Sequence, residues 1–118
     1  MASEGLHEAR KDLPRKTRDR HRALVSLQEE LEAIDWYYQR ADACSDAQLK
    51  AILLHNLHEE MEHSAMLIEW LRREDSTFDR QLRACVFSDG SILERTEADA
   101  GQAPAEDLTT PTIGSLKE

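Results

Sequence analysis

The segment best suited to metal chemistry is Glu60-Met61-Glu62-His63, a Glu-x-x-His motif. Residues three apart lie on one face of a helix, so the Glu60 carboxylate and the His63 imidazole can reach a common ion. Alone the motif is a weak signal, because many helices carry it by chance as solvated surface residues. Its meaning depends on the helix face that carries it.

The spacing of apolar residues places the motif on the predicted buried side of its helix. Steps of four and three connect the members of this stripe: Leu49, Leu53, Asn56, Glu60, His63, Leu67 and Trp70. Burying an unpaired carboxylate costs several kcal/mol, so packing alone would rarely place Glu60 there. Asn56 fits a polar residue that fixes helix register, and it is left out of the ligand set. His55 and His58 lie off the stripe and are interpreted as surface residues.

A second predicted helix supplies another carboxylate. Glu30 flanks a stripe formed by Leu24, Leu27, Leu31, Ile34, Tyr38 and Ala41. Di-iron four-helix proteins use the Glu-x-x-His pair twice and add two further glutamates. One chain offers half of that set, and two chains offer all of it, with four carboxylates to balance two ferrous ions. Oxygen-rich ligands suit iron or manganese better than structural zinc. We therefore hypothesise that Fe(II) is oxidised to Fe(III) at a site whose formation is coupled to pairing.

The elements that must position these residues are predicted to be helices, because Gly and Pro are scarce and strong helix formers dominate. Helices are expected at residues 14–43 and from about 46 to 74, with Ser45-Asp46-Ala47-Gln48 as a capping box. Shorter ones are expected at 77–86 and 92–98. The two long helices predict an all-α antiparallel hairpin, which leaves apolar residues uncovered and completes a four-helix bundle by dimerisation. The expected organisation is a flexible N-terminus at 1–13, a helical domain at 14–98 and a flexible tail at 99–118.

Composition narrows the class of function. The chain has 118 residues and a net charge of −9, which argues against nucleic-acid and anionic-membrane partners and suits a protein that handles cations. It has no apolar run of the roughly 18 residues that span a bilayer, and no signal-peptide pattern. Cys44 and Cys85 form neither a disulfide framework nor a zinc motif, which favours a reducing cytoplasm.

Other interpretations remain for several residues. Glu29, Glu32, Glu59 and Glu62 are most simply a solvated acidic face, or else an entrance that gathers cations. Trp36 and Tyr37 are packing residues or neighbours of the site. Two other functions compete with ferroxidase: a metal-independent helical scaffold or adaptor, and another di-metal ferritin-like oxidoreductase. A scaffold needs only one polar residue to fix the register of its helices. A carboxylate and an imidazole at helical spacing, Glu60 and His63, facing Glu30 are more than that need explains. Another di-metal oxidoreductase, such as one that reduces peroxide, would normally carry an electron-transfer module, and no part of this sequence resembles one.

Four segments carry a family resemblance: His21-Arg22-Ala23, Glu29 through Tyr37, Glu59 through His63, and Glu69 through Arg73. They resemble the encapsulated ferritins, over roughly residues 15 to 95, and the spacing between the glutamates and the Glu-x-x-His motif also matches. The resemblance implies a two-helix ferritin-like chain that pairs to form the ferroxidase centre. It also implies that the dimers form a ring, commonly a decamer.

By the same resemblance the iron ligands are Glu30, Glu60 and His63, with two iron ions at each dimer interface. Glu29 and Glu32 look like the metal entrance, Trp36 like the residue that narrows access, and Tyr37 like a neighbour of the centre. Such proteins have no closed cage, so the resemblance implies that mineral is stored inside an encapsulin shell, within an encapsulin nanocompartment in the cytoplasm.

The tail from Leu108 to Leu116 looks like a peptide that docks cargo onto an encapsulin shell protein, with its core at Ile113, Gly114, Ser115 and Leu116. Apolar anchors on a polar segment suit binding in a groove. The alternative is a disordered end without a role. Beside a ferritin-like body, docking within about 108–118 is the favoured interpretation.

Overall fold

The computed structural model describes residues 5–94, which are helical apart from turns and contain no strand. A short 3-10 helix, η1, spans Arg10–Asp12. Two long helices follow, α1 at Arg15–Ala43 and α2 at Ala47–Glu74, and then α3 at Ser76–Cys85. The all-α prediction is confirmed, and the three main helices lie within one or two residues of their expected bounds. None of the described helices is both long enough and apolar enough to cross a membrane.

Local chemistry explains where the long helices begin and end. Pro14 is the N-cap of α1, where its missing N–H costs nothing because the first helical N–H groups have no partner within the helix. Helix α2 begins after Asp46, whose Oδ1 accepts a hydrogen bond from the backbone N–H of Leu49 at 2.8 Å. The capping box expected from Ser45 to Gln48 is therefore wrong: Asp46 caps the helix instead, because its side chain reaches the third N–H of the helix, and Leu49 has no side-chain acceptor to complete a box.

Helix α3 is fixed at its start by Asp75, whose Oδ1 accepts hydrogen bonds from the N–H groups of Thr77 and Phe78 at 3.0 and 3.1 Å. Asp79 of this helix pairs with Arg72 at the end of α2 and with Arg83 of α3, and these hydrogen bonds hold the pKa of the Asp79 carboxyl below its usual value. Residues 92–94 are helical where the described chain ends. The rest of the helix expected at 92–98 lies outside the described residues.

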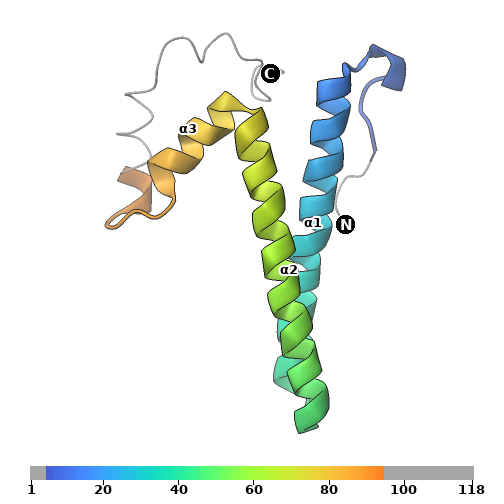
Figure 1. Cartoon of the computed structure of the whole chain (residues 1–118), viewed down its shortest axis with the longest axis vertical. Helices are drawn as coiled ribbons and strands as arrows, with labels where there is room; N and C mark the ends of the chain where they lie inside the picture. The colour runs from blue at the N-terminus through green and yellow to red at the C-terminus, as the bar shows by residue number, and fades with distance from the viewer. Residues whose placement is uncertain (1–4, 95–118) are drawn as a thin grey trace. The chain divides into compact units, whose positions relative to one another are not determined.

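The chain divides into two compact units, one ending at Trp70 and one beginning at Leu71. The first unit holds α1 and most of α2, which lie side by side and run in opposite directions (Figure 1). Residues 44–46 connect them. The antiparallel hairpin predicted from the tight turn is therefore confirmed.

The face that α2 buries in the first unit differs from the sequence prediction. Leu57 is 2% exposed and Ser64 is buried, while α1 buries Ala23 and Ala41. Leu57 and Ser64 lie one position along from the expected stripe through Asn56 and His63. Three of these four residues are small, which allows two helix backbones to approach closely.

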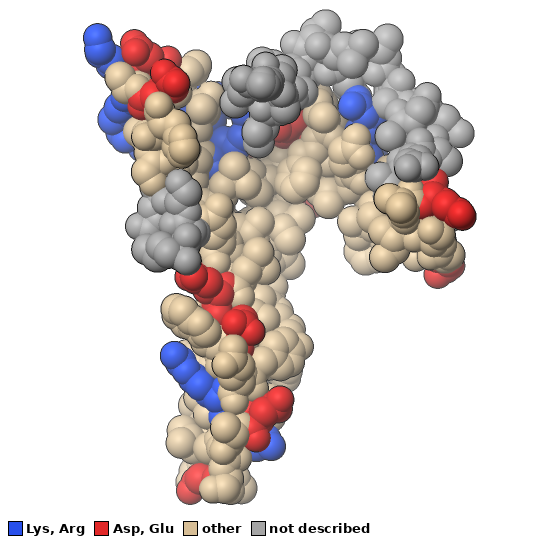
Figure 2. All heavy atoms as spheres, turned by 180° about the vertical axis from the view of Figure 1, so that it is seen from behind, with Lys and Arg blue, Asp and Glu red and all other residues tan. Residues whose placement is uncertain are grey.

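Most residues of the expected stripes are partly buried, and four of them are exposed: Leu31, Tyr38, Leu49 and Trp70. Large apolar side chains of the first unit remain exposed, with Leu31 at 50% and Met66 at 56%; the others include Trp36, Tyr38, Leu49, Ile52 and Trp70. Residues without a formal charge cover most of the face of the long hairpin in Figure 2. Apolar area of this kind is costly to leave in water, so the hairpin offers surfaces suited to a further helix pair.

Candidate metal centre

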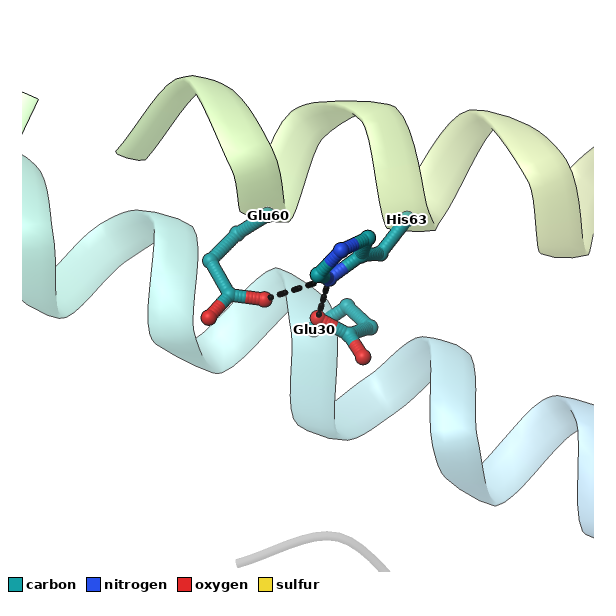
Figure 3. Close-up of side chains that lie close together, drawn as sticks. All are labelled: Glu30, Glu60 and His63. Carbon is teal, nitrogen blue, oxygen red and sulfur yellow. Dashed lines mark hydrogen bonds and ion pairs between the residues drawn. The ribbon is translucent and has the colours of Figure 1, made fainter. Parts of the chain in front are cut away.

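Three side chains that can bind a metal meet between α1 and α2: Glu30, Glu60 and His63. Glu60 and His63 point from α2 toward α1, and Glu30 reaches them from α1 (Figure 3). The Nδ1 atom of His63 lies 3.2 Å from Glu60 Oε1 and 3.4 Å from Glu30 Oε1. One ligand atom from each of the three lies within 4.8 Å of the others. All are partly buried, with side-chain exposures of 26% for Glu30, 22% for Glu60 and 41% for His63.

The backbone of the two helices holds this arrangement. The i, i+3 spacing aligns Glu60 and His63, and the antiparallel pairing brings the middle of α1 beside them. Behind the cluster, the buried hydroxyl of Ser64 donates a hydrogen bond to the backbone carbonyl of Glu60 at 3.0 Å. Ser64 is therefore buried with its hydroxyl satisfied by its own helix.

The crowding of two carboxyls and one imidazole shifts the pKa values of all three groups. The pKa of Glu30 is raised, first because its carboxyl hydrogen-bonds to Glu60, and also by burial and by the Glu60 charge. The same hydrogen bond lowers the pKa of Glu60. The pKa of His63 is raised mainly by its hydrogen bond to Glu60 and by the neighbouring Glu30, against the effect of desolvation. The cluster therefore prefers bound positive charge.

The donor set suits a hard or borderline divalent cation. Two carboxylates and one imidazole supply oxygen and nitrogen ligands, and no thiolate takes part in the group. Three ligands from one chain leave an ion with open positions, and the side chains remain partly exposed. The site of a single chain is therefore chemically able to bind a cation and is sterically open to further ligands.

The other residues expected near the site stay outside the three-residue group. Glu29 and Trp36 are exposed, while Glu32 and Tyr37 are partly covered. The Arg40 guanidinium carbon lies 5.8 Å from the centre of the Trp36 ring and 5.4 Å from that of Tyr37, which are cation–π distances. Sequence reasoning missed Arg40, although the i, i+4 and i, i+3 spacings could have indicated both contacts.

Glu59 also has a closer relation to the site than a solvated acidic face implies. Its Oε1 lies 3.9 Å from Nε2 of His63, and its Oε2 lies 3.9 Å from Nε2 of His55. The spacing of four residues was a usable signal for both pairs. The tail residues assigned to shell docking, Leu108 and Ile113 to Leu116, lie outside the described part of the chain.

Comparison with known proteins places this geometry in a family. The model of the EncFtn-like family matches residues 5–89. An encapsulated ferritin-like protein from Rhodospirillum rubrum is 49% identical over 121 residues, which cover 98% of this chain and 86% of the relative. The encapsulin nanocompartment cargo protein EncC of Myxococcus xanthus is 33% identical over 119 residues, covering 89% of this chain and 92% of that protein.

A solved structure has the same fold as this chain. The crystal structure of a Nitrosomonas europaea protein superimposes with a TM-score of 0.72 at 53% sequence identity, covering 75% of this chain and 97% of that one. The family match spans both long helices and the three-residue cluster. The chain therefore belongs to the EncFtn-like family, the family of the encapsulated ferritin-like proteins.

Proposed function

We propose that this protein is a ferroxidase, which oxidises Fe(II) to Fe(III) at a di-iron site formed between two copies of the chain. The observation that carries the proposal is the meeting of Glu30, Glu60 and His63 within 4.8 Å of one another. Iron is the substrate of this reaction. Each Fe(II) gives up one electron, and dissolved dioxygen is the acceptor.

The residues of the cluster have distinct tasks in this proposal. Glu30 and Glu60 bind Fe(II) through their carboxylates and, because anionic oxygen ligands favour the higher charge, stabilise the Fe(III) product. His63 binds the ion through Nδ1, the nitrogen that faces both carboxylates. Partial exposure of all three side chains leaves a path for the ion and for oxygen. Glu29, Glu32 and Trp36 line the proposed entrance, and Tyr37 is a neighbour of the centre.

Pairing follows from ligand number and charge. One chain supplies two carboxylates and one imidazole, so two chains together supply four carboxylates and two imidazoles. Four carboxylate charges balance the four positive charges of two ferrous ions. The exposed apolar residues of the hairpin support a second copy as the partner, since a four-helix bundle would cover them. We extend this dimer to a ring, of which a decamer is the expected size.

We also propose that the protein works as cargo inside an encapsulin shell in the cytoplasm, where the oxidised iron is stored as mineral. The support is the relative named as an encapsulin nanocompartment cargo protein, together with the tail sequence. Leu108 and the core Ile113-Gly114-Ser115-Leu116 form the proposed docking peptide, in the segment that follows the proposed helical domain at 14–98.

The ferroxidase proposal predicts that oxygen uptake depends on His63. Adding Fe(II) in air to the purified apo-protein should consume oxygen rapidly, and His63→Ala should slow this by more than about tenfold because a metal ligand is lost. His58→Ala is the matched control, since it removes an exposed imidazole of the same helix, and should stay within about twofold of the parent. If the parent consumes oxygen no faster than buffer does, the proposed activity is wrong.

Coupling between metal and pairing predicts an oligomeric state that responds to iron. In anaerobic native mass spectrometry, Fe(II) should shift the parent toward dimers and larger rings, because the ions neutralise carboxylates that otherwise repel. Glu60→Gln should abolish the shift. Glu62→Gln, which removes an exposed charge of the same helix, should leave the shift intact. A parent distribution that is identical with and without iron would contradict the coupling.

The raised pKa values of Glu30 and His63 predict that metal affinity falls as pH falls. Groups with raised pKa values keep their protons to higher pH, so an incoming ion has to displace those protons and competes less well in acid. Titration with Co(II) from about pH 8 to about pH 5.5 should show log affinity decreasing, with a smaller slope for His63→Ala. An affinity that stays constant over this interval would show that these protons do not compete with the metal.

The cargo proposal predicts that the tail is needed for encapsulation. When the chain is expressed with its shell protein, deletion of residues 108–118 should abolish co-purification with the shell, whereas oxygen uptake by the free protein should be unchanged. Replacing Ile113 and Leu116 by serine should have the same effect, because both apolar anchors are lost. Undiminished loading of the truncated chain would refute docking through this segment.

A further inference from the structure

The two ring nitrogens of His63 have different surroundings. Nδ1 faces Glu30 and Glu60 at 3.4 and 3.2 Å, on the side where the three ligands meet. Nε2 lies 3.9 Å from Oε1 of Glu59, a residue of the same helix that is not part of the three-residue group. An ion shared with Glu30 and Glu60 would therefore bind Nδ1 and leave Nε2 toward Glu59.

Metal binding at Nδ1 has a consequence for Nε2. A neutral imidazole carries one proton, and the nitrogen that binds a metal must be free of it. The proton then resides on Nε2, and that N–H needs an acceptor. Ligating histidines usually donate this second N–H to a carboxylate, a carbonyl or water, which fixes the ring orientation and makes the imidazole a better ligand.

Glu59 is placed to be that acceptor. It precedes His63 by four residues, so one turn of α2 holds the two side chains beside each other. The separation of 3.9 Å is longer than a hydrogen bond, and the Glu59 side chain, 48% exposed, has room to rotate about 1 Å closer. Its other oxygen lies 3.9 Å from Nε2 of His55. The carboxylate thus stands between two imidazoles on one helix face.

We propose that Glu59 is a positioning residue of the metal centre, which accepts a hydrogen bond from the Nε2–H of His63 and so keeps Nδ1 directed at the ion. This inference rests on the proposed function, because it concerns the same site. The role requires Glu59 to accept a hydrogen bond from one particular nitrogen, and a negative charge elsewhere on the helix would not provide this. Glu62 carries the same charge three residues further along α2, is exposed, and makes no ion pair with His63 in the described structure.

The test measures metal affinity in the full chain, with Co(II) as the probe and the visible absorption of the bound ion as the signal. Glu59→Met keeps the side-chain length without an acceptor, and Glu59→Gln restores an acceptor oxygen without the charge. Glu59→Met should weaken Co(II) binding by about 10- to 100-fold, and Glu59→Gln should regain most of the loss. Glu62→Met, the charge-matched control, should change the affinity less than about threefold.

A second signal reports the hydrogen bond itself. In the cobalt-loaded parent, the Nε2–H of His63 should give a hyperfine-shifted proton resonance that exchanges slowly with water. Glu59→Met should broaden or remove this resonance, and Glu59→Gln should restore it. Far-UV circular dichroism checks that the helices are intact, and if Glu59→Met proves unfolded, Glu59→Ala takes its place as a strong helix former without an acceptor.

The outcomes separate the two proposals. If His63→Ala binds Co(II) as tightly as the parent, the metal centre itself is wrong. If His63→Ala weakens binding but Glu59→Met and Glu62→Met give equal affinities and an unchanged resonance, the centre stands and Glu59 is only a surface charge. A selective loss in Glu59→Met, rescued in Glu59→Gln, establishes the positioning role.

Discussion

Glu30 and Glu60 bring two carboxylates from neighbouring helices into one partly buried space beside an imidazole. Two carboxylates that lie close enough to share a hydrogen bond repel each other when both are ionised, and burial removes part of the water that would screen their charges. The hydrogen bond between the two carboxyls relieves part of this repulsion, and it raises the pKa of Glu30 while it lowers the pKa of Glu60. A divalent cation would relieve the repulsion more completely, and this preference for bound positive charge underlies the chemistry proposed for the protein.

The hairpin that holds the cluster has a small core of its own. Its buried residues in the first unit are mostly small, and large apolar residues such as Leu31 and Met66 are half exposed. This division has a physical logic. Small residues allow α1 and α2 to approach closely enough for Glu30 to meet His63, while the larger ones remain available for a second hairpin. In the proposed dimer, a second hairpin would cover these apolar residues and would also supply the second half of the ligand set.

Several parts of the structure could be predicted from the sequence because they depend on local rules. Pro14 marks the start of α1, and the i, i+3 spacing together with the place of Glu30 beside the apolar stripe predicted that Glu30, Glu60 and His63 lie close together. The buried face of α2 was predicted one position away from its real place. Adjacent stripes of this helix are both apolar, as Leu53 and Leu57 illustrate, and periodicity does not tell which faces the same chain. The small residue Ser64, which the structure buries in the adjacent stripe, was the available sequence signal.

The surroundings of His63 could be predicted only in part. The i, i+4 and i, i+3 spacings make both Glu59 and Glu60 neighbours of His63, but only side-chain geometry shows that the two carboxylates face different nitrogens of the ring. For Arg40 the same spacings indicate a contact with Trp36 and Tyr37, and the structure adds that the guanidinium lies over both rings.

The central claim is that two copies of this chain share one metal centre. A crystal structure of the protein loaded anaerobically with Fe(II), with diffraction recorded on both sides of the iron absorption edge, tests it directly. The account predicts two anomalous peaks across a two-fold axis, bound by Glu30, Glu60 and His63 of both copies. Iron bound within a single hairpin, or only at exposed glutamates away from His63, would contradict it.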